Sequence, residues 1–283
     1  MLIQLDHVKK EYEGFTLELD MHIPENRVTG LIGANGAGKS TTFKLMLGLI
    51  RPDAGDMKVF EKKAGELSAE DRQKIGTVFS DSGFSEYLTV QQVGRIMQEF
   101  YPHFEPEQFY RRCEYFHIPQ KKKIKEFSTG MKAKLKILLA VSHDSRLLIL
   151  DEPTAGLDVI AREEILDLLR EYMEVPGRSV VLSSHISGDL EHFCDDLYMI
   201  DKGKIVLHED TDRIMEEYGL LKMSEQEFTG LDKEYLLRVR KESFGYSCLT
   251  DQRTYYLENY PMIVNEKGNI DEVIAMLVKG ERV

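Results

Sequence analysis

The feature that most constrains this chain is the stretch Gly33–Ser40 (GANGAGKS), which matches the pattern G-x-x-x-x-G-K-[ST] and is followed by Thr41. The apolar run Val28–Ile32 before it predicts a buried strand, and the sequence from Lys39 onward predicts a helix. A glycine-rich turn in this position can aim backbone N–H groups at phosphate oxygens, and the helix adds the positive end of its dipole. The sequence therefore predicts a phosphate-binding loop on an α/β sheet.

Two side chains of this loop have distinct predicted roles toward ATP. Lys39 is expected to place its charge against the β- and γ-phosphates, and the Ser40 hydroxyl is expected to bind Mg²⁺. The other residues expected to contact the nucleotide are Asn35, Gly36, Ala37, Gly38 and Thr41.

A second pattern supplies two acids at the end of a strand. The apolar run Leu147–Leu150 predicts a buried strand and is followed by Asp151 and Glu152. Asp151 is expected to hold Mg²⁺, and Glu152 to act as a general base on the attacking water, an effect of about 10²–10⁴-fold. Such a run alone is weak evidence, but together with the phosphate-binding loop it predicts hydrolysis.

Composition narrows the function classes. The chain has 283 residues and a net charge of -12, and an acidic chain is a poor candidate for binding nucleic acid. Three widely spaced cysteines form no C-x-x-C pair, which argues against a disulfide framework or a zinc site. The lysine cluster at 121–125 is either a solvated face or a contact with anionic lipid headgroups. The N-terminus does not resemble a signal peptide and no apolar segment approaches about 20 residues, so we expect a cytosolic protein.

The order of elements predicts the fold class. Phe15–Ile23 alternates as a half-buried strand does, and further strands are expected at 75–79, 179–182 and in a hairpin over 197–206. Helices are expected at 128–141 and 159–173. This alternation predicts a mostly parallel sheet covered by helices. Residues from about 89 to 140 form a predicted helical insertion. Beyond about 217, alternating runs at 235–240, 254–259 and 262–266 and a last helix predict a small α/β appendage.

Three further motifs, in this order, identify a family. They are Phe127–Lys132 (FSTGMK), Ala155–Asp158 (AGLD) and Ser183–His185 (SSH). Together with the phosphate-binding loop and the acid pair, this set resembles the ATP-binding cassette (ABC) family over residues 1–219. The resemblance implies a P-loop NTPase cassette with an antiparallel β subdomain, and a division into a nucleotide-binding domain (1–219) and a C-terminal accessory domain (220–283).

The resemblance also implies roles for individual residues. Tyr12 would stack on adenine, and His185 would contact the γ-phosphate. Ser128 and Gly130 would open a helix that caps the γ-phosphate of ATP held by a second ATP-binding subunit, with Asp158 at the seam between the two subunits.

Two positions depart from the family pattern. Ser80 stands where the family has a glutamine, or sometimes a glutamate, that touches Mg²⁺ and the attacking water, and Asp81 follows it. We expect Ser80 to act through water, or Asp81 to replace it. The FSTGMK motif corresponds to the family signature, and Thr129 stands there in place of its first glycine. We expect this replacement to weaken the contact between the two subunits modestly.

The function implied by the resemblance is that of an ATPase subunit in a transporter. ATP and Mg²⁺ would close two subunits, identical or paralogous, and hydrolysis would open them to drive a separate transmembrane permease. The protein would then lie on the cytoplasmic face of the membrane, and the FSTGMK motif with the appendage is similar to the branch that exports drugs, peptides or other amphipathic compounds. The alternatives are a non-transport ABC ATPase and a nucleotide-sensing regulatory subunit.

Overall fold

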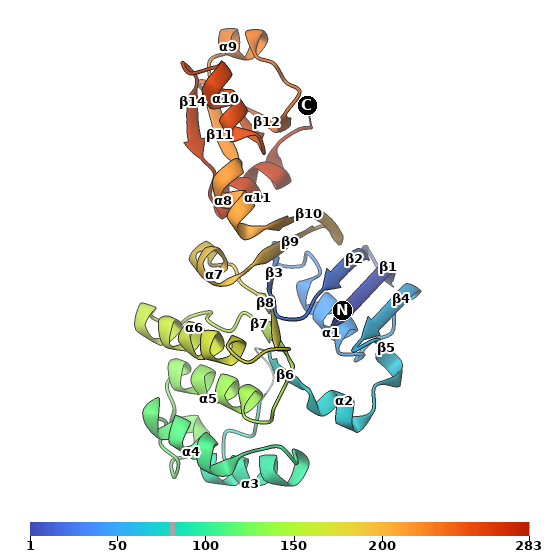
Figure 1. The fold of residues 1–283 in the computed structure, drawn as a ribbon, viewed down its shortest axis with the longest axis vertical. Coiled ribbons are helices and arrows are strands. Elements are labelled where there is room, and N and C mark those ends of the chain that lie inside the picture. The colour runs from blue at the N-terminus through green and yellow to red at the C-terminus, as the bar shows by residue number, and fades with distance from the viewer. Residues whose placement is uncertain (80–82, 283) are drawn as a thin grey trace.

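The computed structural model describes residues 1–79 and 83–282, which form two β-sheets with helices around them (Figure 1). The strands of the larger sheet are β1 (Ile3–Tyr12), β2 (Phe15–Ile23), β3 (Val28–Ile32), β4 (Ala54–Val59), β5 (Lys62–Lys63), β6 (Ile75–Val78), β7 (Leu147–Asp151), β8 (Ser179–Ser183), β9 (Asp196–Asp201) and β10 (Lys204–Asp210). Their order across the sheet is β5-β4-β1-β2-β10-β9-β3-β8-β7-β6.

The helices associated with this sheet are α1 (Lys39–Met46), α2 (Ala69–Gln73), α3 (Val90–Phe100), α4 (Pro106–Tyr115), α5 (Thr129–Val141), α6 (Val159–Met173), α7 (Ser187–Phe193) and α8 (Thr211–Glu217), with short 3₁₀ turns at Ala64–Glu66 and Ile124–Glu126. Strands β6, β7, β8, β3 and β9 are parallel, whereas β1, β2, β4 and β5 are antiparallel to one another. The predicted cassette, with a mostly parallel sheet, an antiparallel part and a helical insertion, is confirmed.

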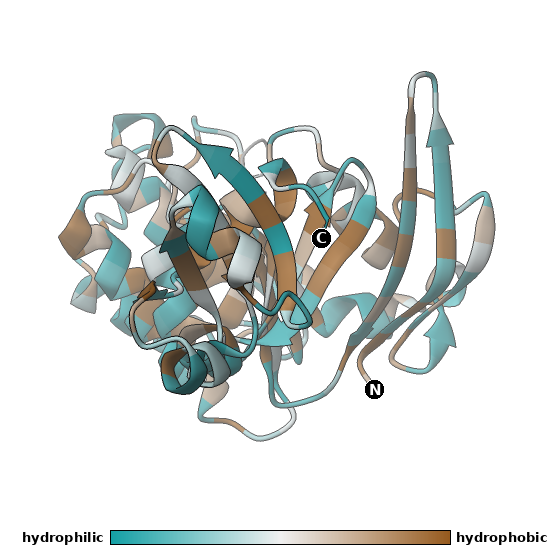
Figure 2. Cartoon of the chain, turned by 90° about the horizontal axis from the view of Figure 1, so that it is seen from above, coloured by the Kyte–Doolittle hydropathy of each residue, from teal (hydrophilic) through white to brown (hydrophobic). Residues whose placement is uncertain are grey.

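Strand β7 shows why the parallel part of the sheet is continuously apolar in sequence. Successive side chains of a strand point to opposite faces. Leu148 and Leu150 belong to the core that includes α5 and α6, whereas Leu147 and Ile149 belong to the core that includes α1. Because both faces are covered, no polar position interrupts the run until the strand ends at Asp151. The hydrophobic residues gather on the strands near the centre of the molecule (Figure 2).

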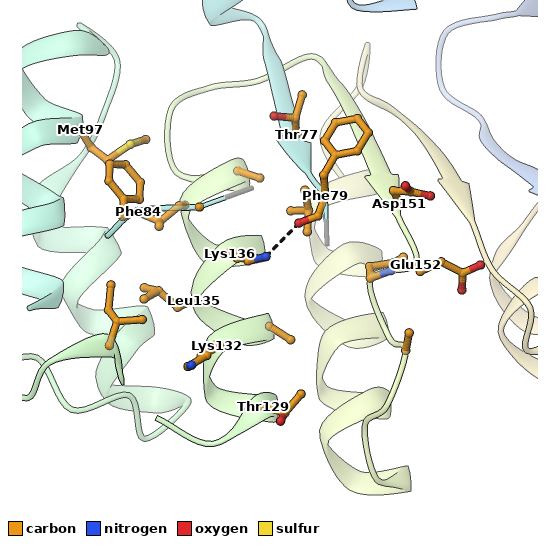
Figure 3. Close-up of a pocket in the computed structure, with 18 of the residues that line it drawn as sticks. Thr77, Phe79, Phe84, Met97, Thr129, Lys132, Leu135, Lys136, Asp151 and Glu152 are labelled. Carbon is orange, nitrogen blue, oxygen red and sulfur yellow. Dashed lines mark hydrogen bonds between the residues drawn. The ribbon is translucent and has the colours of Figure 1, made fainter. Parts of the chain in front are cut away.

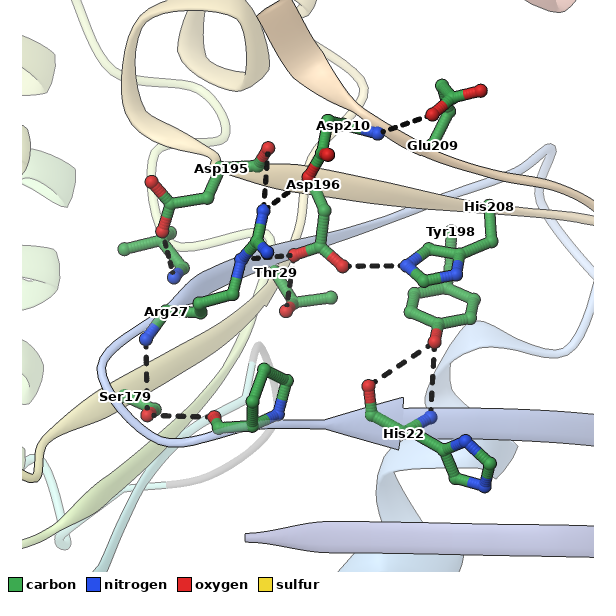
Figure 4. A network of polar contacts seen from close by, with 12 residues as sticks. His22, Arg27, Thr29, Ser179, Asp195, Asp196, Tyr198, His208, Glu209 and Asp210 are labelled. Carbon is green, nitrogen blue, oxygen red and sulfur yellow. Dashed lines mark hydrogen bonds and ion pairs between the residues drawn. The ribbon is translucent and has the colours of Figure 1, made fainter. Parts of the chain in front are cut away.

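The β9–β10 hairpin joins the parallel and antiparallel parts of the sheet. Its backbone register with β2 is a single residue pair, Lys204 with Glu18, and one side chain of β9 adds a further contact with β2. Asp196 of β9 accepts a hydrogen bond from the Thr29 hydroxyl (2.8 Å) and lies 2.8 Å from His208 Nε2. The Tyr198 ring stacks on His208 with centroids 3.8 Å apart, and its hydroxyl oxygen accepts a hydrogen bond from the His22 backbone N–H (Figure 4).

The C-terminal part forms a sheet of its own with the strands β11 (Gly219–Met223), β12 (Leu236–Glu242), β13 (Gly245–Thr250) and β14 (Val264–Lys267) and the helices α9 (Glu225–Gly230), α10 (Arg253–Asn259) and α11 (Ile270–Lys279). Its strands are antiparallel in the order β12-β13-β11-β14. The chain order βαββαβ with this strand order is the ferredoxin-like arrangement.

One predicted strand in this part was wrong. Residues 254–259 lie in helix α10, which buries Tyr256 against one face of the small sheet, in a core with Leu221 and Cys248. A short apolar run does not distinguish a helix from a strand by periodicity, and here packing against the sheet decides the conformation.

Helix α11 docks the C-terminal part onto α7. The Ser187 hydroxyl of α7 donates a hydrogen bond to the Asp271 carboxylate of α11 (2.9 Å), and Ile270 N–H faces the Glu191 carboxylate at 3.4 Å. Figure 1 shows the small sheet stacked beyond β9 and β10, away from α3 and α4. Over residues 1–79 and 83–282, the structure contains no helix of the length and apolarity that crossing a membrane requires.

Candidate functional site

The loop between β3 and α1 is shaped by glycines with little room around them. Gly38 has φ +122°, and a Cβ there would lie 2.5 Å from Leu17 Cδ1. A Cβ at Gly33 would lie 2.4 Å from the carbonyl oxygen of Ile200. These two positions require glycine because of backbone conformation and close packing, respectively. They fix the loop against β2 and β9.

The rest of the loop presents polar groups to solvent. Asn35, Gly36 and Ser40 are exposed, whereas Ala37 is buried. Lys39 is also largely buried, and its ammonium donates to the carbonyl oxygens of Gly33 (2.6 Å) and Ala34 (3.4 Å). The loop thus encloses the lysine charge at its centre.

Ser40 and Asp151, which are 111 residues apart in sequence, meet at the site. The Ser40 hydroxyl donates to Asp151 Oδ2 at 3.0 Å. A hydroxyl oxygen and a carboxylate oxygen side by side match the oxygen ligands that Mg²⁺ takes in proteins. These two residues therefore fit the predicted metal role.

Glu152 has an unusual backbone and a close partner. Its φ is +52°, in the left-handed region that non-glycine residues rarely adopt, and such strain often marks functional sites. His185 Nδ1 lies 2.6 Å from Glu152 Oε2, and the His185 backbone N–H donates to the same oxygen at 3.3 Å. The structure thus brings the predicted base into direct contact with the histidine predicted to bind the γ-phosphate.

Ser183 contacts both predicted acids, a role that was not expected from the sequence, where it was noted only as part of the SSH motif. Its buried hydroxyl donates to Asp151 Oδ1 (2.6 Å) and accepts from the Glu152 backbone N–H (2.9 Å). The signal available in the sequence was a serine at the end of a buried strand.

The predicted subunit-seam residues lie at helix N-termini. Ser128 caps α5 by accepting from Met131 N–H (3.2 Å), and Asp158 caps α6 by accepting from Ala161 N–H (2.9 Å). Both caps are exposed, and a Cβ at Gly130 would meet the Ala161 side chain at an ordinary 3.5 Å. Within the described residues, these groups make no hydrogen bond to the phosphate-binding loop.

Another predicted residue, Tyr12, takes part in none of these contacts. Tyr12 is at the end of β1 with 46% of its surface exposed, and Lys10 Nζ lies 5.9 Å from its ring centroid. An exposed ring is available to stack on a base. Ser80 and its alternative Asp81 lie outside the described residues, so their predicted roles stay predictions.

A cavity of about 780 Å³ opens beside the acid pair. Residues of α5 and of the ends of β6 and β7 line it, and Figure 3 shows Lys136 of α5 pointing toward Phe79. The Lys136 ammonium donates to the Phe79 carbonyl oxygen at 2.9 Å, which ties α5 to the end of β6. Asp151 and Glu152 also line this space, so whatever occupies it lies close to the two predicted hydrolytic residues.

Comparisons with known proteins agree with this geometry. Residues 17–155 match the family model described as ABC transporter. The chain is 32% identical to the lantibiotic transport ATP-binding protein SrtF of Streptococcus pyogenes over 75% of this chain and 92% of that protein. It is 30% identical to the linearmycin resistance ATP-binding protein LnrL of Bacillus subtilis, covering 84% and 79% respectively, and 25% identical to the B. subtilis ABC transporter ATP-binding protein YtrB over 99% of both.

Solved structures give the same answer for the fold. A structure described as the ATP-binding subunit of an ABC transporter superposes with a TM-score of 0.68 at 26% identity, covering 76% of this chain and 92% of that one. The ATP-binding cassette MJ0796, solved as a dimer with ADP and phosphate, gives a TM-score of 0.65 at 21% identity, covering 74% and 99%. The latter likeness concerns the fold alone.

Proposed function

Because the chain belongs to the ABC transporter family of ATP-binding proteins, we propose that it hydrolyses ATP with Mg²⁺ to drive a separate membrane permease. The observation that carries this proposal is a continuous set of contacts at the carboxyl ends of β7 and β8. It runs from Ser40 through Asp151 to Ser183, and Ser183 in turn contacts Glu152, which contacts His185. This set connects the phosphate-binding loop with the groups needed to activate water.

The residues divide the work of hydrolysis as follows. Loop N–H groups and the Lys39 ammonium bind and orient the β- and γ-phosphates. Ser40 and Asp151 would hold Mg²⁺, which would supply positive charge against the phosphate oxygens. The Glu152 carboxylate accepts a proton from the water as its oxygen bonds to the γ-phosphorus, and the bond from that phosphorus to the β-phosphate oxygen breaks to give ADP and phosphate. His185, in contact with Glu152, holds the carboxylate in place and donates toward the γ-phosphate.

We also propose that two ATP-binding subunits act together. The exposed Ser128 cap is free to face the γ-phosphate of a second subunit, and a helix N-terminus favours an anion. Val159 and Ile160, directly after Asp158, are 70% and 75% exposed, and a partner subunit would cover this apolar surface. ATP would thereby bind the two subunits to each other.

The permease is expected to dock at the cavity beside Phe79 and Phe84, next to the hydrolytic acids. We place the protein on the cytoplasmic face of the membrane, where such a partner would hold it. Two relatives are named for lantibiotic transport and linearmycin resistance, which supports an exported peptide or drug-like compound as the cargo. We assign residues 1–219 to the nucleotide-binding domain and 220–283 to an accessory domain, because the second sheet has a core of its own.

The test is nucleotide binding and phosphate release by the purified chain, compared with Lys39→Ala and Lys44→Ala. Both lysines lie on α1, but Lys44 is exposed on its outer face, so its removal changes the charge equally without touching the loop. We expect Lys39→Ala to lose Mg²⁺-ATP hydrolysis and Lys44→Ala to keep it. Equal activity of the two variants would show that the loop is not the catalytic phosphate site.

The location is tested by fractionating the cells that make the protein. The chain should sediment with membranes and be released by alkaline carbonate, because it is held by a protein partner. A chain found wholly in the supernatant would refute the proposed attachment to a permease.

A further inference from the structure

Ser183 lies at the point where strands β7 and β8 end side by side. It is the last residue of β8 and is opposite Asp151 in the parallel register with β7. Its side chain is fully buried, and its hydroxyl touches both members of the acid pair. It donates to Asp151 Oδ1 at 2.6 Å and accepts from the backbone N–H of Glu152 at 2.9 Å.

These contacts leave Asp151 little freedom. Its other oxygen, Oδ2, accepts from the Ser40 hydroxyl at 3.0 Å, so one neighbour holds each oxygen of the carboxylate. Ser40 donates from the phosphate-binding loop, whereas Ser183 donates from within the sheet. The oxygen on the Ser40 side is therefore kept directed at the place where a metal ion and the phosphates would meet.

The same hydroxyl also anchors Glu152. The left-handed backbone at this residue is strained and persists only if surrounding contacts hold it. The Glu152 N–H has two acceptors on one residue, the Ser183 hydroxyl at 2.9 Å and the Ser183 carbonyl oxygen at 3.2 Å. Ser183 thus fixes the direction in which the general base leaves the strand.

We propose that Ser183 is a positioning residue that sets the Mg²⁺ ligand Asp151 and the base Glu152 at once. This inference rests on the proposed ATPase function and adds a residue to it. Ser183 touches neither the nucleotide nor the metal, and acts only through the two acids. Its neighbour Ser184 serves the other side of the strand end, where its hydroxyl accepts from Ile186 N–H (3.1 Å) and supports the turn that carries His185.

Loss of this hydroxyl has a predictable consequence. Removal of a group that orients a metal ligand typically costs 10–100-fold in metal affinity or activity. In Ser183→Ala, the Asp151 carboxylate keeps only the Ser40 contact, while the Glu152 N–H keeps the carbonyl acceptor. We therefore expect a protein that folds and binds ATP but uses Mg²⁺ poorly.

The experiment measures Mg²⁺ dependence through binding as well as through turnover. A fluorescent ATP analogue is titrated onto the full chain with Mg²⁺ and with EDTA, and the ratio of the two Kd values is compared between wild type and Ser183→Ala. We expect the ratio of the Kd in EDTA to the Kd in Mg²⁺ to fall by about 10–100-fold, while the Kd in EDTA changes less than about twofold. At saturating Mg²⁺, kcat is expected to fall while the KM for ATP stays unchanged.

Two further variants separate positioning from packing. Ser179→Ala removes an equally buried hydroxyl from the same strand, but this one donates to the Pro24 carbonyl oxygen, away from the acids. It should lower stability without changing the Mg²⁺ ratio. Ser183→Thr retains the hydroxyl and should restore the ratio. If Ser183→Ala unfolds, Ser183→Cys fills the same space with a much weaker donor and gives the same test.

An unchanged Mg²⁺ ratio and kcat in Ser183→Ala would overturn the inference, and so would an equal loss in Ser179→Ala. A wild-type chain that binds ATP in a Mg²⁺-dependent way without hydrolysing it would refute the ATPase proposal instead. In that case the binding ratio still decides the role of Ser183.

Discussion

Replacing Glu152 with glutamine removes proton acceptance while keeping the size and shape of the side chain. Glutamine has nearly the same shape, and its carbonyl oxygen can accept the hydrogen bonds that His185 now gives to Glu152 Oε2 at 2.6 and 3.3 Å. What is lost is the ability to take a proton from water, which is worth about 10²–10⁴-fold in rate. At about 1.36 kcal/mol per tenfold, the barrier should rise by about 2.7–5.4 kcal/mol.

The assay combines phosphate release with mass in solution. The variant should bind Mg²⁺-ATP, hydrolyse it at least about a hundredfold more slowly than the wild type, and accumulate as an ATP-dependent dimer. Glu163→Gln is the matched control, because it makes the same change on the exposed face of α6, where the carboxylate pairs with Arg170. Hydrolysis by Glu152→Gln within about threefold of the wild-type rate would refute the general-base assignment, since a base cannot be neutralised without a large loss.

Three other predictions use groups around the site. Asp189→Ala should destabilise the fold by about 1–3 kcal/mol, because it leaves the buried Thr154 hydroxyl and nearby Arg162 without their acceptor. Denaturant unfolding should show a lower midpoint with the same m-value, and an unchanged midpoint would contradict this. Burial lowers the pKa of His143 in the folded chain, so the unfolded chain binds the proton more readily. The free energy of unfolding should therefore be highest above pH 6.5 and fall as the pH drops below it, by at most about 1.4 kcal/mol per pH unit. Unfolding curves of His143→Gln should lose that slope, and a slope that persists would assign it to another group. Tyr12→Ala should weaken ATP binding by roughly 1–3 kcal/mol while Tyr12→Phe keeps it, because stacking on a base needs the ring and not the hydroxyl. Isothermal titration that gives one affinity for all three proteins would remove Tyr12 from the site.

The predictable parts of the fold were those with a local signal. Strand β3 and helix α6 have the bounds expected from sequence, because a glycine turn and the Asp158 cap mark where each element stops or starts. In the C-terminal part, strands β11 and β13 gave no alternating signal. Leu220 and Leu221 face different cores on the two sides of β11, so consecutive positions are apolar.

The predictable parts of the site were those within a motif. Lys39 and Ser40 were expected from a single stretch of sequence, and so were Asp151 and Glu152. The hydroxyl contact from Ser183 depends on β8 lying next to β7 in a given register, and that neighbour relation arises only from the order of strands in the sheet. The sequence contains the serine but does not show what stands beside it.

The strand order has a consequence for how the protein is made. Strand β3, which leads into the phosphate-binding loop, has β8 and β9 as its two neighbours, and roughly 150 residues separate it from either in sequence (Figure 1). At about 5–20 residues per second, a nascent chain would wait roughly 7–30 seconds between the synthesis of β3 and that of β8. The predicted phosphate-binding loop is thus translated early, whereas the two strands that flank β3 follow much later. During that interval β3, which is buried along its whole length in the folded chain, lacks both of its neighbouring strands, and exposed apolar surface of this kind is the reason that chaperones exist.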